Sequence, residues 1–217
     1  MAELLLHSYW RATAPYRVRI GLAIKGLAFD YAPINLLKNE QGEAPYRDRY
    51  NRQALVPALT AGGRTFTQSL AILEWLDETH PQPSLLPGSA ADRATIRAMA
   101  EIVACDIHPL NNLRVLKALG ALGHESGGDD QQAWGRRWIE DGFSALEPMV
   151  AEYGAGFAFG DTPTLADCAL IPQIWSSSRF AVDLSAFPAL SAVAKHAGEH
   201  PAFQAAHPDR QPDKPAA

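Results

Sequence analysis

The sequence predicts two domains, a mixed α/β domain followed by an all-helical one. Strand and helix patterns alternate over the first third of the 217 residues, and only helical patterns follow. Between them, residues 81–92 (PQPSLLPGSAAD) are rich in Pro, Ser and Gly, which is typical of a connection. We therefore expect an α/β domain over 1–83, a linker over 84–88 and a helical domain over 89–217.

The first domain opens with an expected strand, helix and second strand. Residues 3–9 (ELLLHSY) form a short apolar run. The helix begins near Pro15, whose missing N–H costs nothing in a first turn, and Gly26 is suited to end it. Residues 29–36 (FDYAPINL) predict the next strand, and Pro33 within it favours the edge of a sheet.

A hairpin and a helix are expected to complete this domain. Residues 38–53 are polar and irregular, with one helical turn at most. The pattern of residues 54–69 (ALVPALTAGGRTFTQS) is strand, Gly-Gly turn, strand. Residues 69–81 (SLAILEWLDETHP) then form an amphipathic helix with Ser69 near its N-cap and Pro81 beyond its end.

The second domain is expected to hold long helices. One covers 93–122 and is bent or restarted near Pro109, and another covers 131–153. The tail from Ala205, rich in Pro and Asp, is predicted to be extended.

A Thr-x-x-Asp motif, Thr164 to Asp167, precedes an apolar run in this half. The spacing resembles a capping box with Asp in place of the usual Glu. The prediction is a structural role for Asp167, not a catalytic one.

Composition excludes several classes of protein. The net charge of −5 argues against general binding to nucleic acid or to an anionic membrane. No apolar run is long enough for a transmembrane helix, and the N-terminus lacks the basic region of a secretory signal. Cys105 and Cys168 have no metal-ligand partners at short spacing, so we expect no metal site and two reduced, buried thiols in a cytoplasmic protein.

Two short segments could carry chemistry. In LVPAL (55–59), a cis Val56–Pro57 bond would turn the backbone of Val56 toward an extended peptide; an ordinary edge strand is the alternative. In TQSLAI, Ser69 opens a helix, where its hydroxyl and the first N–H groups form an anion site, unless Ser69 is only a cap.

These segments together resemble a known family over essentially the whole chain. A strand ending in VP, a glycine-turn hairpin and QS before a helix resemble the glutathione site of glutathione transferases, whose first domain is thioredoxin-like. The resemblance narrows to the zeta class, which includes maleylacetoacetate and maleylpyruvate isomerases. The matching segments are SYWRATAPYRVRIGLAIKG, PINLLK, LVPAL, QSLAILEWLDETHP, LLP, DIHPLNNLRVL, GDTPTLADCALIPQI, RFAVDL and RQPD.

The resemblance implies glutathione as cofactor and assigns residues to it. Val56, beside Pro57, pairs with the cysteinyl backbone of glutathione, and Gln68 and Ser69 hold its γ-glutamyl end. A facing wall comes from the second domain. The remaining assigned residues are Ala12, Thr13, Ala14, Arg17 and Gln41 in the first domain and His108, Asn112 and Arg114 in the second.

The expected sulfur site departs from the family pattern. Zeta enzymes usually carry serines after the first strand, and one hydroxyl bonds the glutathione sulfur. Here the stretch is Arg11-Ala12-Thr13-Ala14, and Ala12 has no donor. We expect the Thr13 hydroxyl and the N–H groups at the helix N-terminus to stabilise the thiolate. Zeta enzymes also often have a polar side chain near position 42 that contacts glutathione. Gly42 cannot make this contact, so Gln41 is the residue expected to make it.

The implied reaction is cis-trans isomerisation of maleylacetoacetate, as in tyrosine catabolism, by reversible thiolate addition. Of the crowded arginines, Arg11 is expected to bind one substrate carboxylate and Arg179 the other, while Arg17 approaches glutathione and Arg19 forms a structural ion pair. Three alternatives stay open: maleylpyruvate as substrate, glutathione transfer to α-haloacids or other electrophiles, and a glutathione-binding protein without turnover. The family also implies a homodimer.

Overall fold

The structure, a computed structural model, describes residues 3–123 and 128–215. Contacts divide the chain into two compact units, Met1–Leu85 with Glu199–Ala217, and Leu86–Gly198. The first boundary lies within the linker expected at 84–88. The second differs from the expected 89–217 domain, because the last residues of the chain lie with the first unit. Each unit is described separately below.

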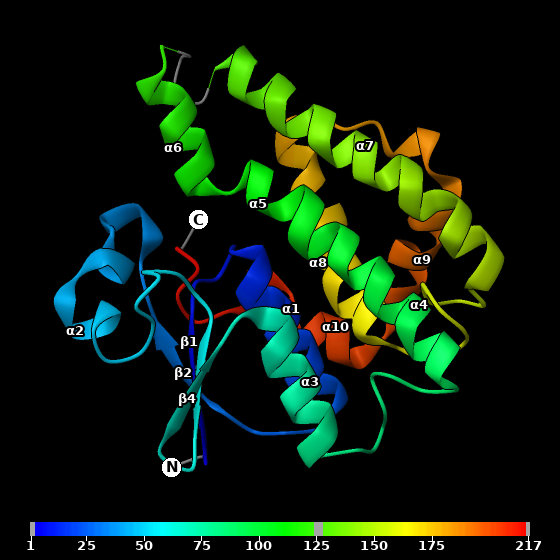
Figure 1. Ribbon diagram of the computed structural model, residues 1–217, viewed down its shortest axis with the longest axis horizontal. Helices are drawn as coiled ribbons and strands as arrows, with labels where there is room; N and C mark the ends of the chain where they lie inside the picture. The colour runs from blue at the N-terminus through cyan, green and yellow to red at the C-terminus, as the bar shows by residue number, and fades with distance from the viewer. Residues whose placement is uncertain (1–2, 124–127, 216–217) are drawn as a thin grey trace. The chain divides into compact units, whose positions relative to one another are not determined.

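The first unit is a four-stranded sheet covered by helices. Figure 1 shows α1 and α3 on one side of the sheet and α2 on the other. Its elements are β1 Leu4–Ser8, α1 Thr13–Ile24, β2 Asp30–Pro33, the 3₁₀ turns η1 Leu36–Lys38 and η2 Glu40–Gly42, α2 Ala44–Arg47, β3 Ala58–Ala61, β4 Arg64–Thr67, α3 Ser69–Thr79, α10 Pro201–Ala206 and the 3₁₀ turn η6 Pro208–Arg210.

The sheet order is β2-β1-β3-β4, with β1 and β2 parallel and the other pairs antiparallel. Strand β2 therefore lies at an edge, which confirms the position predicted from Pro33. The Gly-Gly hairpin is also confirmed: Gly62 and Gly63 have φ of 53° and 80°, the left-handed conformation that a tight hairpin turn needs. Pro57, however, lies just before β3 instead of within a strand.

The core of this unit lies between the sheet and the α1–α3 pair. Leu6 of β1, Ile20 of α1 and Ile72 of α3 are fully buried, and burying each such side chain stabilises the fold by about 1.5–3 kcal/mol. Gly21 allows the two helices to approach closely, since a Cβ there would overlap Leu73.

A buried ion pair ties the end of α1 to the end of α3. The ammonium of Lys25 donates to Asp77 Oδ1 (2.5 Å) and to the carbonyl oxygens of His80 (2.6 Å) and Pro83 (2.5 Å). All three ammonium protons therefore have acceptors. Removing one partner of such a buried pair typically costs about 3–5 kcal/mol.

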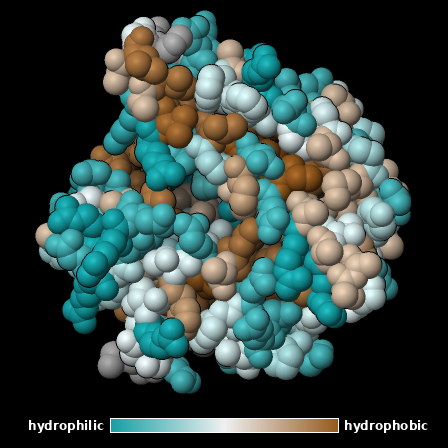
Figure 2. All heavy atoms as spheres, viewed as in Figure 1, coloured by the Kyte–Doolittle hydropathy of each residue, from teal (hydrophilic) through white to brown (hydrophobic). Residues whose placement is uncertain are grey.

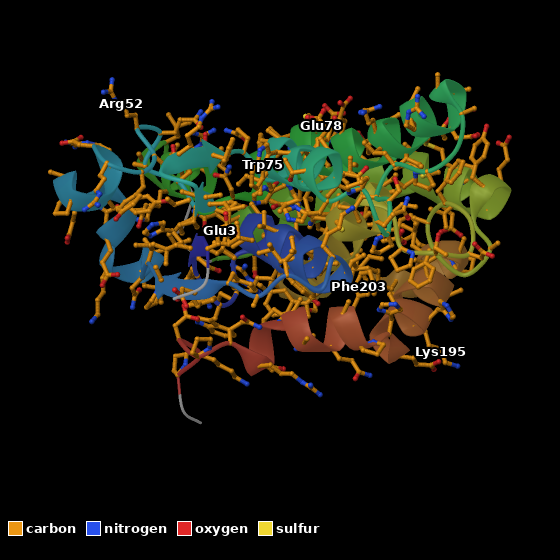
Figure 3. All side chains as sticks on the ribbon, turned by 90° about the horizontal axis from the view of Figure 1, so that it is seen from below. Glu3, Arg52, Trp75, Glu78, Lys195 and Phe203 are labelled. Atoms are coloured by element: carbon orange, nitrogen blue, oxygen red, sulfur yellow. The ribbon has the colours of Figure 1, made fainter. Side chains whose placement is uncertain are left out.

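Residues 205–215 of the tail are not extended as predicted, because they hold the end of α10, η6 and turns; the last two residues of that prediction lie outside the described residues. Helix α10 packs on α1, and Figure 3 shows Phe203 where they meet. Two histidines cap successive turns: His200 Nδ1 accepts from Ala202 N (3.2 Å), and His207 Nδ1 accepts from Asp209 N (3.2 Å). These caps satisfy the first amides of short turns that begin with proline.

The second unit is all-helical. Its elements are α4 Ala90–Glu101, the π-helical segment η3 Ile102–Ile107, α5 His108–Asn111, α6 Leu113–Ala121, α7 Asp129–Tyr153, α8 Leu165–Ser177, the 3₁₀ turns η4 Ser178–Phe180 and η5 Leu184–Ala186, and α9 Pro188–Glu199, which ends one residue into the first unit. The predicted bend near Pro109 is confirmed. The helix widens into η3 before the proline and breaks at Asn112, which has extended backbone.

The predicted capping box is present at the start of α8. Asp167 Oδ2 accepts from the amide and hydroxyl of Thr164, both at 2.8 Å, and Oδ1 accepts from Ala158 N (2.7 Å). Asp167 is fully buried. Burial raises the pKa of its carboxyl to about 6, and these hydrogen bonds oppose the rise. The structural role predicted for Asp167 fits this geometry.

The surface around α2 is hydrophilic, and apolar residues gather along α6 (Figure 2), where Leu113 and Leu122 are exposed. Within residues 3–123 and 128–215, no helix has the length and apolar character needed to cross a bilayer. Cys168 is buried as expected, but Cys105 is exposed, so that expectation was wrong for one of the two cysteines.

His7 is an uncharged histidine buried under α2. Its ring lies 4.0 Å from the Tyr50 ring and 5.5 Å from the Tyr46 ring, centroid to centroid. Neither ring nitrogen has a hydrogen-bond partner among the described residues. Burial, followed by the charge of Arg49, lowers the pKa of His7 to about 4.

We expect His7 to make stability depend on pH. Below pH 6.5 the unfolded chain protonates His7 while the folded chain does not, so the free energy of unfolding falls as the pH drops from 6.5 to 4. The loss due to His7 is at most about 3 kcal/mol. His7→Phe should remove this part of the fall, as measured by urea unfolding at pH 7.5, 5.5 and 4.5. Other titrating groups, including Asp167, are common to both proteins; identical pH dependence in the two would contradict the assignment.

Candidate functional site

The sheet register brings four connecting segments to one end of the sheet. Ser8, the last residue of β1, pairs with Pro33, the last of β2, while His7 pairs with Ala58, the first of β3. Ala58 in turn pairs with Thr67, the last of β4. The segments that follow β1, β2 and β4 and the segment that precedes β3 therefore lie at the same end. The segment after β1 leads into α1, and the segment after β4 leads into α3. Every candidate residue of the first unit lies in one of the four segments or in one of these two helices.

Helix α1 starts at this end without a side-chain cap. Thr13 is its first residue, and Ala12, at the N-cap, makes no capping hydrogen bond. The first intrahelical bond runs from Tyr16 N to Ala12 O (3.1 Å), so the amides of Thr13 and Ala14 precede it. The Thr13 side chain is buried and makes no hydrogen bond with another residue of the described ranges. These donors and the positive end of the helix dipole are suited to an anion.

Arg17 links α1 to the start of α3. It lies one turn after Thr13, on the same face of α1, and its Nη1 donates to Ser69 Oγ (3.2 Å). Only 2% of Arg17 is exposed. A guanidinium and a hydroxyl thus meet at the N-terminus of an 11-residue helix, a second place suited to an anionic group.

Ser69 is the first residue of α3, next to the N-cap residue Gln68, which agrees with the prediction that Ser69 opens the helix near its N-cap. Gln68 has φ of 68°, and positive φ is uncommon for residues other than glycine. Its side-chain amide donates to Gln53 Oε1 (2.7 Å). Residues held in such conformations cluster at binding sites.

The segment before β3 is anchored one residue ahead of Val56. The carbonyl of Leu55 accepts hydrogen bonds from Tyr46 Oη (2.6 Å) and Asn51 Nδ2 (2.8 Å). The Val56–Pro57 bond is cis, the less common of the two alternatives. The backbone N–H and C=O of Val56 make no hydrogen bond with residues 3–123 or 128–215, so both groups are available to an extended ligand.

Gln41 lies in η2, in the segment after β2. Its amide nitrogen donates to Asn39 Oδ1 (2.9 Å). Its carbonyl oxygen is buried and accepts no hydrogen bond within the described chain.

Three candidates of the second unit lie around the break between α5 and α6. His108 is the first residue of α5, and Arg114 is exposed on α6. Asn112 is the N-cap of α6, where Oδ1 accepts from the amides of Arg114 (3.1 Å) and Val115 (3.2 Å). Its carbonyl oxygen therefore has a local structural role, and its amide group remains for a ligand.

Arg179 is exposed in η4, after α8. Helix α7 supports both this segment and α5. Trp134 Nε1 donates to Leu110 O (2.7 Å), and Arg136 Nε donates to Phe180 O (3.1 Å). The two segments that carry the second-unit candidates thus pack on neighbouring residues of one helix.

Tyr46 and Asn51 are positioning residues that the sequence did not indicate. Both lie in the polar stretch 38–53, where nothing distinguishes them from solvent-exposed neighbours. Yet both are buried, and burial raises the pKa of Tyr46 above its usual value, so its hydroxyl remains a donor.

Family comparisons agree with this geometry. Residues 14–84 match the family model "Glutathione S-transferase, N-terminal domain", and residues 132–197 match "Glutathione S-transferase, C-terminal domain". A curated relative, maleylacetoacetate isomerase of Pseudomonas aeruginosa, is 43% identical over 98% of this chain and 99% of its own.

Two solved structures are similar over nearly the whole chain. One is a holo structure of a bacterial zeta-class maleylpyruvate isomerase: 43% identity, TM-score 0.93, covering 97% of this chain and 100% of its own. The other is a maleylacetoacetate isomerase of Anaeromyxobacter dehalogenans with dicarboxyethyl glutathione and citrate bound in the active site: 44% identity, TM-score 0.87, covering 98% of this chain and 94% of its own.

The chain belongs to the glutathione S-transferase family. Within it, the similarity is to the zeta class and to its maleylacetoacetate and maleylpyruvate isomerases.

Proposed function

We propose that this chain is a glutathione-dependent isomerase that converts maleylacetoacetate to fumarylacetoacetate. The observation that carries the proposal is that three features lie at one end of the sheet. They are the start of α1, the Arg17–Ser69 pair, and the backbone of Val56, whose N–H and C=O make no hydrogen bond within the described residues. Such an end offers anion sites and a peptide-binding edge, which an acidic thiol tripeptide needs. Similarity to maleylacetoacetate isomerases over 98% of the chain supports the same reaction.

The chemistry requires a thiolate and two cations. The substrate's C=C bond prevents rotation; addition of the glutathione thiolate to one carbon leaves a C–C single bond and an enolate. After rotation, the enolate re-forms the double bond and expels the thiolate, so glutathione is regenerated. The protein must keep the sulfur deprotonated, orient it, and bind the carboxylates and the enolate. The dicarboxyethyl glutathione bound by the Anaeromyxobacter relative is a glutathione that carries a dicarboxylate.

The residues divide these tasks as follows. Thr13, with the amides of Thr13 and Ala14, holds the sulfur, and Val56 beside Pro57 pairs with the cysteinyl backbone. Gln68, Ser69 and Arg17 bind the γ-glutamyl carboxylate. The further contacts to glutathione come from Ala12, Gln41, His108, Asn112 and Arg114.

Arg11 and Arg179 bind the two ends of the substrate. Arg11 lies in the turn that leads into α1, with its guanidinium 6.0 Å from the centroid of the Trp10 ring, and is half-buried beside the proposed sulfur site. Arg179 is exposed in its own unit. A planar guanidinium binds a carboxylate with two parallel hydrogen bonds, which gives each end a defined orientation.

Maleylpyruvate is the second candidate substrate, because a zeta-class maleylpyruvate isomerase is similar over 97% of the chain. The two substrates share the cis-enone and differ in the group beyond it. We further propose that the chain acts as a homodimer in the cytoplasm, and that its pathway is tyrosine breakdown.

Thr13→Val should raise the thiol pKa of bound glutathione by about one unit, because the sulfur loses a hydrogen-bond donor. Thiolate absorbance of the complex, followed as the pH is varied, measures this. Thr13→Ser keeps a hydroxyl and serves as the matched control, with a pKa near wild type. An unchanged pKa in Thr13→Val would assign the role to the backbone amides alone.

Arg11→Ala and Arg179→Ala should each lower kcat/KM for the dicarboxylate about a hundredfold, since each removes a charge-assisted contact to the reacting molecule. The Kd for glutathione, measured by calorimetry, should change less than threefold. Arg52→Ala is the control, as Arg52 points into solvent (Figure 3). Equal losses in kcat/KM and in glutathione affinity would contradict the substrate clamp.

The function itself is tested by an ultraviolet assay with maleylacetoacetate and with maleylpyruvate, each with and without glutathione. Isomerisation should require glutathione and leave the free thiol concentration unchanged. Stoichiometric loss of thiol would indicate a transferase instead. Retention on immobilised glutathione without turnover of either substrate would indicate a binding protein.

A further inference from the structure

The C-terminal tail contains RQPD (210–213), a motif that the proposed reaction does not use. In the structure it follows α10 and η6 in the first unit. This places Asp213, about two hundred residues away in sequence, against the turn that leads into α1.

Arg19 holds one side of this turn. The guanidinium donates to Ser8 Oγ (3.1 Å) at the end of β1, to Trp10 O (3.0 Å) in the turn, and to Ala206 O (3.0 Å) at the end of α10. Only 1% of Arg19 is exposed. Burial lowers the pKa of Arg19 to about 10, so the side chain is still charged at neutral pH.

Asp213 holds the other side. Its Oδ2 accepts from the backbone N–H of Trp10 (2.9 Å), and its Oδ1 accepts from the hydroxyl of Tyr31 (2.6 Å) on β2. The N–H and the C=O of Trp10 are thus both bound by charged side chains. Hydrogen bonds to ionised groups are shorter and stronger than those between neutral groups.

The turn so held runs from Tyr9 to Ala12, closed by the bond from Ala12 N to Tyr9 O (3.0 Å). Thr13, the first residue of α1, follows at once. Because Ala12 makes no side-chain capping hydrogen bond, the start of the helix is held by backbone hydrogen bonds of Ala12, one of which closes this turn. The position of the Thr13 hydroxyl and of the first amides depends on the turn before them.

We propose that Asp213 and Arg19 are positioning residues for the thiol site, meaning the Thr13 hydroxyl and the first amides of α1. The C-terminal tail then contributes to the geometry of that site. This inference rests on the proposed function in so far as the sulfur lies at Thr13. Arg19 acts from within α1 and Asp213 from the tail, and both bind the backbone of Trp10, at its C=O and its N–H respectively. A shift of the start of α1 by a few tenths of an ångström would lengthen hydrogen bonds to a sulfur.

Asp213→Ala tests this, with Asp209→Ala as the matched control. Asp209 lies on the same tail but is exposed and pairs with Lys214 (2.6 Å), without contact to the turn. We expect Asp213→Ala to raise the thiol pKa of bound glutathione by about one unit and to lower kcat about tenfold. The KM for glutathione should change less than threefold. Asp209→Ala should match wild type in all three quantities.

A purely structural tail would give a different result. Asp213→Ala would then lower the melting temperature but leave the thiol pKa and kcat at wild-type values. That combination of results would overturn the inference. If Asp213→Ala does not fold, Asp213→Asn replaces it. The amide oxygen can still accept from Trp10, but a hydrogen bond to a neutral acceptor is weaker and holds the turn less firmly, so the thiol pKa should rise by about half a unit; no rise overturns the inference.

Hydrogen–deuterium exchange separates this inference from the proposed function. In the absence of any ligand, the amides of residues 10–14 should exchange about tenfold faster in Asp213→Ala than in wild type or Asp209→Ala. Equal exchange overturns the positioning role even if the enzyme turns over. If the wild-type protein neither lowers the thiol pKa of glutathione nor isomerises either substrate, the proposed function is overturned. The exchange measurement still shows whether Asp213 positions residues 10–14.

Discussion

The register of β1 with its neighbours is the constraint on which the rest of the site depends. Because β1 runs parallel to β2 and antiparallel to β3, its C-terminal end meets the end of β2 and the beginning of β3. The hairpin partner β4 then ends there too. A slip of one residue would turn Leu6 away from the core and separate the segments that carry Thr13 and Val56. The hydrophobic face of the sheet therefore determines that the N-termini of α1 and α3 lie at the same end of the sheet.

Positive charge is concentrated at this end of an otherwise acidic chain, and each arginine has its own environment. Arg17 reaches Ser69 at the start of α3. Arg19, two residues on and on another face of α1, instead joins β1, the turn and the tail. Arg11 extends from the turn itself. Under the proposed function, an anionic tripeptide and an anionic substrate both require cations, and arginines clustered near the start of α1 would provide them in a chain whose net charge is negative.

Local patterns in the sequence predicted most elements of the fold. Pro33 indicated an edge strand, Gly62-Gly63 a hairpin and Thr164–Asp167 a helix start, because each depends on residues close together in the chain. Long-range contacts left no such pattern. The tail was expected to be extended because it is rich in Pro and Asp. No local pattern in it indicates the hydrogen bond from Trp10 N to Asp213. Tyr46 and Asn51 were missed for the same reason: their shared acceptor, Leu55 O, shows no signal in the sequence. The roles of Thr13, Arg11 and Arg179 stay predictions drawn from resemblance.

A crystal structure of the protein with glutathione tests the central claim most directly. The account predicts that the sulfur lies within about 3.5 Å of Thr13 Oγ1 or of the first amides of α1. It also predicts that Val56 pairs with the cysteinyl backbone and that the γ-glutamyl carboxylate lies at Ser69 and Arg17. A sulfur directed away from the start of α1, with glutathione bound elsewhere in the first unit, would contradict it.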